Sequence, residues 1–439
     1  MSRYGQVPTA KLSTRQVADR LGVKPETVYA YVSRGLLHSV REQGGRGSWF
    51  DQAEVDALAA RSRLGRQEPP GQADPQGRSG LAAGGRGAAG QPVIATGLTQ
   101  MKDGKLYYRG LEVARLARTE SFESVVGLLW TGSLGRPPTF AAPAATVQIV
   151  RTVRAALPAS ARLTDLLRIV PAVGSATDPL RFDTRPGPVV AAAATLIAML
   201  IDALPYADGS DACGRTAERA QSAESPSLAR RLWPKLTART ATPERIKALN
   251  AALIVLADHD LAVSTLAGRV AASARAHPYA VVSAALGAFD GPLHGAAGSH
   301  SYRLLADALA SGDPVGAYAD RLRTQGWVEG FGHPAYPDGD PRATVLLDLL
   351  DQSATLRPEL RAVAESLIET AHRHGRDLPN VDFALPVLTH VYEMVPDAGE
   401  VIFIVARTAG WIAHALEEYE EPPLRFRYQG TYRGPAPTD

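Results

Sequence analysis

The chain of 439 residues contains one cysteine and no long uninterrupted hydrophobic stretch. The single thiol, Cys213, excludes an intrachain disulfide and a metal site built from cysteines, and it suggests a reducing compartment. The longest apolar run, residues 189–201, ends at Asp202 and is shorter than the ~18 residues that a membrane-spanning helix needs. The first residues lack the apolar segment of a signal peptide. We therefore expect a soluble cytoplasmic protein, no contact with a membrane, and a buried core helix at residues 189–201.

Several motifs of nucleotide and metal enzymes are also missing. No Gly-x-x-x-x-Gly-Lys-Ser/Thr sequence occurs, which excludes a P-loop enzyme, and no His-Glu-x-x-His sequence occurs, which disfavours a zinc enzyme. The glycine-rich stretch near residues 80–90 follows no strand pattern, so we do not expect it to bind a dinucleotide. These absences predict no metal site.

Charge and composition divide the chain into three parts. Residues 1–66 contain 11 Lys and Arg against 6 Asp and Glu, whereas the net charge of the whole chain is only +2. Residues 63–96 have almost no large apolar side chains, so we expect a flexible linker that cannot bury enough surface to fold. From residue 97 onward, apolar residues recur at three- and four-residue spacing, which predicts an all-helical body. Residues 253–275 are among the predicted helices.

The basic part, residues 1–62, has the pattern of a winged helix-turn-helix. A first helix begins at Ser13 or Thr14, Gly22 permits a turn into a second helix, and residues 36–50 form a hairpin that turns at Gly44-Gly45. The layout resembles MerR-type and excisionase-like modules. The resemblance implies binding of double-stranded DNA through these residues: Lys24, Thr27, Arg34, Arg41 and Arg46. A structural module without a DNA partner is the alternative.

Two histidines of the body stand between glycines and prolines. His294 lies in GPLHGAAG and His333 lies in GFGHPAYPDGDPR, where a helix cannot form and the backbone can approach a ligand closely. Histidine exchanges protons near neutral pH. Asp382, in PNVDF, precedes a predicted helix and suits a carboxylate base of restrained mobility.

The arginines of the same region suit an anionic substrate. Arg342, Arg407 and Arg427 can each bind a carboxylate through two N–H groups, so together they match a substrate with two or more carboxylates. Each residue alone also has a structural explanation. A histidine in a loop can be a surface residue, Asp382 can cap a helix, and Arg407 can be a buried ion-pair partner. The combination favours a catalytic site.

The body resembles the citrate synthase family over residues 97–434. The resemblance is carried by YYRGLEVARLA, ADHDLAVST, GPLHGAAG, GFGHPAYPDGDPRA, PNVDF and ARTAGWIAHALEEY, which occur in the family's order and approximate spacing. It implies an all-α homodimer in which each subunit has a large domain, residues 97–293 and 386–439, and a small domain, residues 294–385. It further implies condensation of a short acyl-CoA with a 2-oxo acid, usually acetyl-CoA with oxaloacetate, and no permanently bound cofactor.

The resemblance also implies a role for each residue. Asp382 removes a proton from the acyl α-carbon, His294 hydrogen-bonds the thioester oxygen, and His333 polarises the ketone of the 2-oxo acid. The residues expected to hold the substrate carboxylates are His259, Arg342, Arg407 and Arg427, the last from the partner subunit. Coenzyme A is expected beside Gly330, Phe331 and Gly332, with Arg376 near its phosphates.

Several positions depart from the family pattern around the implied pocket. Ala262 replaces an asparagine that helps to position the 2-oxo acid, and Gly298-Ser299 replaces an Asn-Glu pair. These changes leave open whether the acyl group is acetyl or propionyl and which 2-oxo acid is used. Two other functions also remain open. The chain can be a DNA-binding transcriptional regulator that uses the body as a metabolite sensor, or chiefly a scaffold.

Overall fold

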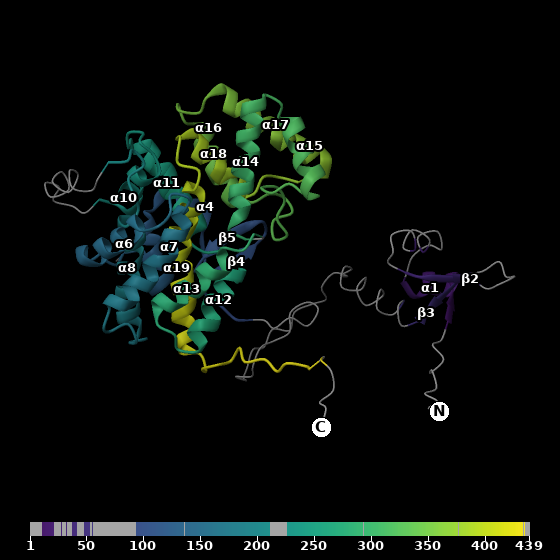
Figure 1. Cartoon of the computed structure of the whole chain (residues 1–439), viewed down its shortest axis with the longest axis horizontal. Coiled ribbons are helices and arrows are strands. Elements are labelled where there is room, and N and C mark those ends of the chain that lie inside the picture. The colour runs from purple at the N-terminus through teal and green to yellow at the C-terminus, as the bar shows by residue number, and fades with distance from the viewer. Residues whose placement is uncertain are drawn as a thin grey trace. The chain divides into compact units, whose positions relative to one another are not determined.

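The computed structural model describes residues 11–21, 37–41, 48–52, 94–135, 137–210, 226–292, 294–375, 377–432 and 434, with the single positions 28, 32 and 55. The chain divides into two compact units, residues 1–95 and 96–439 (Figure 1). The residues predicted to bind DNA or phosphates that lie outside the described residues are Lys24, Thr27, Arg34, Arg46 and Arg376. Arg41 lies in a described strand, but its side chain is outside the description.

The first unit contains a helix and a three-stranded antiparallel sheet. The helix is α1 (Thr14–Leu21), and the strands are β1 (Lys11–Ser13), β2 (Ser39–Arg41) and β3 (Ser48–Asp51), in the order β1-β3-β2. The antiparallel pairing of β2 with β3 confirms the predicted hairpin. Val17, Val28 and Phe50 are among the buried apolar residues that join helix and sheet into one small core.

The second unit begins with a small sheet that the sequence did not predict. Its strands are β4 (Thr99–Lys102), β5 (Lys105–Tyr108) and β6 (Leu111–Glu112), all antiparallel. Asp103 and Gly104 join β4 to β5 with φ angles of +51° and +69°. Positive φ at both positions of a two-residue turn matches the right-handed twist of a hairpin.

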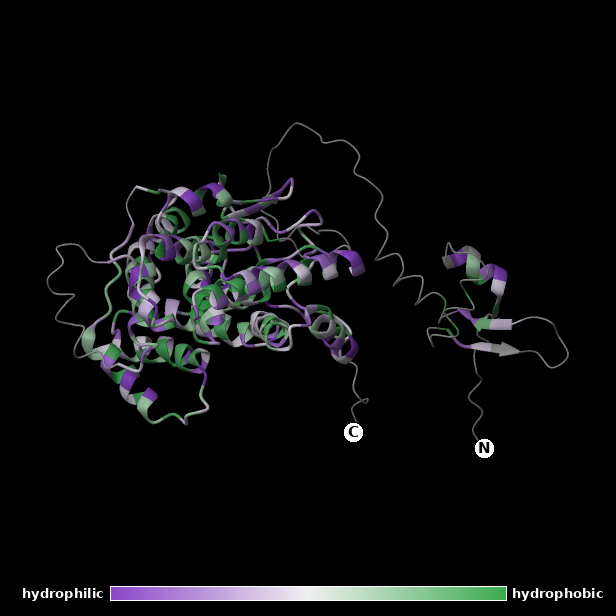
Figure 2. Ribbon diagram, turned by 90° about the horizontal axis from the view of Figure 1, so that it is seen from above, coloured by the Kyte–Doolittle hydropathy of each residue, from purple (hydrophilic) through white to green (hydrophobic). Residues whose placement is uncertain are grey.

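The remainder of the described second unit is helical, as predicted. The helices before the central one are α4 (Val113–Thr119), α5 (Phe122–Thr131), α6 (Ala144–Ala155), α7 (Leu163–Thr177), α8 (Pro186–Asp202), α10 (Leu228–Leu236), α11 (Pro243–Leu256), α12 (Val263–Ser273), α13 (Pro278–Phe289), α14 (Ala296–Ser311), α15 (Pro314–Gln325), α16 (Pro341–Asp351), α17 (Pro358–Gly375) and α18 (Val381–Val391). Hydrophobic residues concentrate in the interior of this body (Figure 2). Nine of the 13 residues 189–201, in α8, are buried, including all of residues 196–201, which confirms the predicted core helix.

Helix α19 (Ala398–Glu420) is the centre of the body. It packs against α5, α7, α8, α11, α12, α13, α14 and α18. Of the described helices, it alone is long and apolar enough to cross a membrane, but 89% of its most apolar window is buried inside the fold. Helices α14 to α18 gather on one side of the body, where α14 contacts α19 and α16 contacts α11 (Figure 1).

The predicted continuous helix over residues 253–275 is wrong. Helix α11 ends at Leu256, and α12 begins at Val263. Arg407 Nε donates to the carbonyl oxygen of Leu256, the last residue of α11, at 2.8 Å, and Tyr108 Oη lies 3.1 and 3.3 Å from the carbonyl oxygens of residues 254 and 255. Asp260 then takes a positive φ of 53°. The chain therefore leaves the helix because of distant donors, which periodicity cannot reveal.

Candidate active site

The residues predicted to act on the substrate come from loops and helix ends that are far apart in the sequence. Three histidines lie between helices: His259 between α11 and α12, His294 between α13 and α14, and His333 between α15 and α16. Three charged residues lie within helices: Arg342 near the start of α16, Asp382 near the start of α18, and Arg407 in α19. The described contacts and mutual electrostatic effects join these six residues into one site.

His259 and His333 form a cluster with Tyr336. The two imidazole centroids are 5.1 Å apart, and Tyr336 Oη lies 2.9 Å from His259 Nε2. The backbone N–H of Ala335 donates to His333 Nδ1 at 3.1 Å. Desolvation and the charge of Arg342 lower the pKa of His333, so its ring is neutral at pH 7. With Nδ1 accepting, the single ring proton lies on Nε2, which is a hydrogen-bond donor.

Arg342 and Asp340 form a buried ion pair beside this cluster. Arg342 Nε and Nη2 donate to the carboxylate oxygens of Asp340 at 2.9 and 2.8 Å. Asp340 also accepts the backbone N–H groups of Arg342 and Val381. Burial lowers the pKa of Arg342, but Asp340 more than offsets this effect. One carboxylate thus keeps Arg342 charged and ties the start of α16 to the start of α18.

The loop that precedes His333 is held against the start of α18. Asn380 donates from its backbone to the carbonyl of Gly330 at 2.9 Å and from Nδ2 to the carbonyl of Gly332 at 2.8 Å. Asn380 Oδ1 also accepts the backbone N–H of Asp382 at 2.9 Å. Gly330 has a φ of +92°, and a Cβ there would lie 2.7 Å from Ser301 Oγ. This close packing requires glycine and fixes His333 relative to Asp382.

His294 is neutral and held by a serine. Its Nε2 lies 2.8 Å from Ser264 Oγ, and the same oxygen accepts from Trp411 Nε1 at 3.2 Å. Desolvation and Arg407 lower the pKa of His294 to about 4. Trp411 Nε1 can only donate to the Ser264 oxygen, which leaves the proton of that hydroxyl available for His294 Nε2. The arrangement favours the tautomer whose Nδ1–H is free to donate to a ligand.

Arg407 and Asp382 influence each other inside the site. Arg407 is 1% exposed, and burial lowers its pKa to about 10, while Asp258 and Tyr108 oppose that effect. Desolvation raises the pKa of Asp382, and Arg342 and Arg407 partly counter the rise. A carboxylate with a raised pKa is a better proton acceptor than an ordinary one.

The remaining predicted site residues differ in placement. Gly330, Phe331 and Gly332 lie against the start of α18, where the Phe331 ring is tilted by 39° to that of Phe383 with the centroids 4.8 Å apart. Arg427 is exposed in the segment after α19, and its backbone N–H bonds to the carbonyl of Leu424. No described contact joins Arg427 to the site within one chain.

Three residues of the site escaped sequence reasoning. Tyr336 contacts His259, Asp340 pairs with Arg342, and Ser264 binds His294. Tyr336 and Asp340 lie in the same glycine- and proline-rich stretch as His333, so their position was a usable signal. Ser264 lies in a helix, and nothing local marks it.

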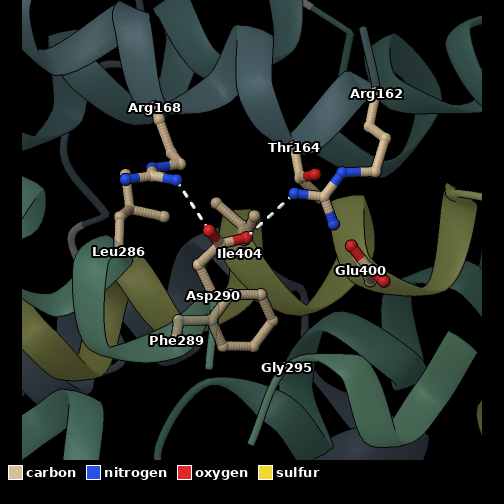
Figure 3. Close-up of a pocket in the computed structure, with 9 residues that line it drawn as sticks. All are labelled: Arg162, Thr164, Arg168, Leu286, Phe289, Asp290, Gly295, Glu400 and Ile404. Atoms are coloured by element: carbon tan, nitrogen blue, oxygen red, sulfur yellow. Dashed lines mark hydrogen bonds and ion pairs between the residues drawn. The ribbon is translucent and has the colours of Figure 1, made fainter. Parts of the chain in front are cut away.

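A small pocket lies behind the His294 loop, between α7, α13, α14 and α19 (Figure 3). Arg162 and Arg168 both donate to Asp290, the C-terminal cap of α13, at 3.0 and 2.7 Å. Across the pocket, Ser299 of α14 donates to Glu400 of α19. These contacts anchor both flanks of the loop that carries His294.

The chemistry of the site follows from these states. A carboxylate with a raised pKa lies with two neutral imidazoles that can donate hydrogen bonds, and two guanidinium groups supply positive charge. This set suits proton removal beside a carbonyl group and binding of an anionic substrate. Within the described residues, no group of three or more His, Cys, Asp or Glu side chains is arranged to hold a metal ion.

Comparisons with known proteins agree with this fold. The sequence model of the family described as "Citrate synthase, C-terminal domain" matches residues 87–428, and that of a "Helix-turn-helix domain" matches residues 12–63. The citrate synthase of Synechocystis sp. is 29% identical over 76% of this chain and 86% of that protein. The 2-methylcitrate synthase 2 of Corynebacterium glutamicum is 28% identical over 73% of this chain and 86% of its own length. The crystal structure of Thermotoga maritima citrate synthase matches with a TM-score of 0.64 at 25% identity, over 80% of this chain and 96% of that one.

Fold and site together define a mainly helical enzyme in which ionisable side chains from several helices and loops are brought together. The family match spans well over half of the chain. The chain belongs to the citrate synthase family, and it is a citrate synthase-type enzyme that carries a helix-turn-helix domain at its N-terminus.

The lowered pKa of His294 predicts a loss of stability in acid. The ordinary value of 6.5 applies to the unfolded chain, so the unfolded state binds this proton more readily than the fold, whose pKa is about 4. The contribution of neutral His294 to the free energy of unfolding is therefore complete above pH 6.5, and it disappears as the pH falls toward 4. We expect His294→Gln to lose less stability than the wild type between pH 7 and pH 5 in urea unfolding at one protein concentration. His372→Gln, on an exposed face of α17, should keep the wild-type slope. Parallel losses in all three proteins would contradict the assignment.

Proposed function

We propose that the enzyme condenses acetyl-CoA with oxaloacetate and hydrolyses the product thioester to give citrate and free coenzyme A. The observation that carries the proposal is the meeting of Asp382 with two neutral imidazoles and the guanidinium groups of Arg342 and Arg407. The relatives named above include citrate synthases and a 2-methylcitrate synthase, so propionyl-CoA is the competing acyl donor. We also propose that the enzyme acts in the cytoplasm.

In the first step, Asp382 accepts a proton from the acyl α-carbon. The electron pair of that C–H bond forms a carbon–carbon double bond, and the π pair of the carbonyl group moves to the thioester oxygen. His294 donates from Nδ1 to this oxygen as negative charge develops. A preorganised donor of this kind contributes about 3–4 kcal/mol to the transition state. Since His294 is neutral, it donates a hydrogen bond without having to be a cation.

In the second step, the nucleophilic carbon attacks the ketone carbon of the 2-oxo acid. His333 donates from Nε2 to the ketone oxygen and gives up its proton to the resulting alkoxide. His259, Arg342 and Arg407 hold the carboxylates, and Arg427 of the partner subunit completes the set. Water then attacks the thioester carbonyl. One of its protons replaces the proton that His333 gave up, and Asp382 passes the proton taken from the α-carbon to the departing thiolate, so coenzyme A leaves as the thiol. Closure of the helices that carry His333 and Asp382 excludes water before condensation.

We propose that coenzyme A binds beside the loop of Gly330, Phe331 and Gly332, where glycines without side chains let a ligand come close to the backbone. Arg376 is proposed for its phosphates. Acyl-CoA is a substrate in this scheme, and no permanently bound cofactor is required.

We propose that the enzyme is a homodimer joined through α12 and α13. The only charged residue of α12 is Arg269, which is fully buried, and α13 has no charged residue. On α12, Val263, Leu266 and Val270 are nevertheless 68%, 39% and 45% exposed, at helical spacing. An uncharged apolar face of this extent is typical of a surface that another protein covers. A second copy of this chain is the proposed partner, because Arg427 does not reach the site within one chain and a second subunit could supply it.

We further propose that the helix-turn-helix domain binds double-stranded DNA. The support is the family match over residues 12–63 and the excess of basic residues in residues 1–66. Such binding adds a function to the enzyme and does not replace catalysis, because the domain and the site lie in different compact units. The use of the body only as a metabolite sensor has no support.

Replacement of the proposed base should abolish turnover. We expect Asp382→Asn to reduce kcat by about 10³-fold and His294→Ala by about 10²- to 10³-fold, because one loses the proton acceptor and the other the oxyanion donor. Thiol release from acetyl- and propionyl-CoA with a panel of 2-oxo acids measures this. Asp320→Asn, at an exposed carboxylate of α15, is the matched control and should keep wild-type activity. A wild type that releases no thiol with any pair would refute the proposal.

If the dimer forms through α12, a charged side chain on the exposed apolar face of this helix should convert the protein to a monomer. We expect Leu266→Glu to shift the sedimentation velocity from dimer to monomer and to reduce activity, since Arg427 is then no longer supplied. Leu180→Glu, at a residue 76% exposed outside this face, should remain dimeric. A wild type that sediments as a monomer at micromolar concentration would count against the shared site.

The DNA proposal predicts salt-sensitive binding by the full chain. On mixed-sequence double-stranded DNA, the logarithm of the affinity should fall linearly with the logarithm of the salt concentration, with a slope of about −0.9 for each phosphate contact. Combining Arg41→Ala with Arg46→Ala should reduce the slope by about two contacts, whereas Arg323→Ala in α15 should not change it. Binding that does not respond to salt would exclude this role.

A further inference from the structure

The residue that precedes His259 is a fully buried aspartate. The side chain of Asp258 has no exposed surface, and its Oδ2 accepts from the hydroxyl of Thr99 and from His414 Nε2, the latter at 3.4 Å. Its backbone carbonyl accepts from Tyr108 Oη at 2.8 Å. Contacts from β4, β5 and α19 therefore hold this one residue in place.

His414 connects Asp258 to a buried arginine. Arg269 Nη1 lies 2.9 Å from His414 Nδ1, and both residues are fully buried. A guanidinium group can only donate, so His414 Nδ1 is the acceptor and carries no proton. The ring proton then lies on Nε2 and points to Asp258. In this chain of hydrogen bonds, Arg269 donates to His414, and His414 donates to Asp258. We call these three residues the buried triad.

Hydrogen bonds through Glu417 connect the buried triad to residues 96 and 97, where the second unit begins. Arg269 Nε donates to Glu418 at 3.0 Å, and its Nη1 donates to Glu417 at 2.9 Å. Glu417 in turn accepts from the hydroxyl of Thr96 and from the backbone N–H of Gly97 at 2.9 and 2.8 Å. The negative charges of α19 thereby balance Arg269.

The triad is also electrically coupled to the substrate site. Burial raises the pKa of Asp258, but His414, Arg407 and Thr99 together lower it below its ordinary value, so the group is ionised. The same carboxylate opposes the effect of burial on Arg407. Asp258 is thus the sequence neighbour of His259 and a counter-charge of Arg407. In the proposed function, His259 and Arg407 both bind the carboxylates of the 2-oxo acid.

The packing shows how closely this carboxylate is fitted. A Cβ at Gly410 of α19 would lie 2.3 Å from Asp258 Oδ1 and 2.5 Å from the carbonyl oxygen of Ala257. On the other side of His259, Asp260 has a positive φ. The backbone of His259 is therefore fixed between a clamped aspartate and a residue in the left-handed region. A buried group of charges is costly where apolar packing would suffice, which favours a role beyond stability.

We infer that the buried triad of Asp258, His414 and Arg269 positions His259 and Arg407 for the 2-oxo acid. The inference rests on the proposed function, since it concerns the binding of that substrate. Asp258 does not touch the substrate. It fixes the backbone that carries His259 and keeps a negative charge near Arg407, and His414 and Arg269 hold its carboxylate in the required direction.

The test compares fully buried Asp258 with Asp202, a partly buried carboxylate in an ion pair elsewhere. Asp258→Asn keeps the size of the side chain and removes its charge, and we expect a KM for oxaloacetate at least 10-fold above wild type with kcat within threefold. Asp202→Asn is the matched control, because Asp202 pairs with Arg231 at 2.7 Å in another part of the core. The control should lose stability without a change in KM. Calorimetric titration of oxaloacetate alone gives the affinity independently of turnover.

A second pair of variants covers the case in which Asp258→Asn does not fold. His414→Gln can still accept from Arg269 and donate to Asp258, so we expect a near-normal KM, whereas His414→Leu should show the raised KM. Unchanged KM and affinity in Asp258→Asn or His414→Leu, or a loss of kcat alone, would overturn the inference. A wild type that binds oxaloacetate but releases no coenzyme A from any acyl-CoA would instead refute the proposed function, and the calorimetric comparison would still decide the role of the triad.

Discussion

The structure of the site depends on keeping two buried guanidinium groups, those of Arg342 and Arg407, in the charged state. Arg342 and Arg407 are both nearly free of solvent exposure, and a buried cation is stable only beside a counter-charge or a hydrogen-bond acceptor. Asp340 forms a direct ion pair with Arg342. Arg407 donates to the carbonyl of Leu256 and is stabilised by the negative charge of Asp258. The loops of the site are arranged around these contacts.

The same positive charges set the states of the histidines. Burial, Arg342 and Arg407 lower the pKa values of His259, His294 and His333, so all three rings are neutral near pH 7. Neutral rings with one nitrogen already accepting a hydrogen bond present a defined donor to a substrate. Asp382, in contrast, gains basicity from desolvation. One environment thus supplies the hydrogen-bond donors and the proton acceptor that the proposed condensation requires.

Much of the site could be predicted from residue types in their local settings. His294 and His333 were identified by the glycines and prolines beside them, and Asp382 by its place before a helix. The break between α11 and α12 was not predicted, because it depends on Tyr108 and Arg407, which are distant in the sequence. Ser264, which orients His294, lies in an ordinary helical pattern and gave no signal.

The sequence by itself determined the helical class of the body, the three-part composition of the chain and the family to which it belongs. These depend on local periodicity and on motifs in a fixed order. Only the tertiary structure decided which partners each charged side chain has, and hence which proton each imidazole carries. Protonation depends on burial and on charges a few ångströms away, and folding brings those charges from positions that lie up to about a hundred and fifty residues apart, as Asp258 and His414 do.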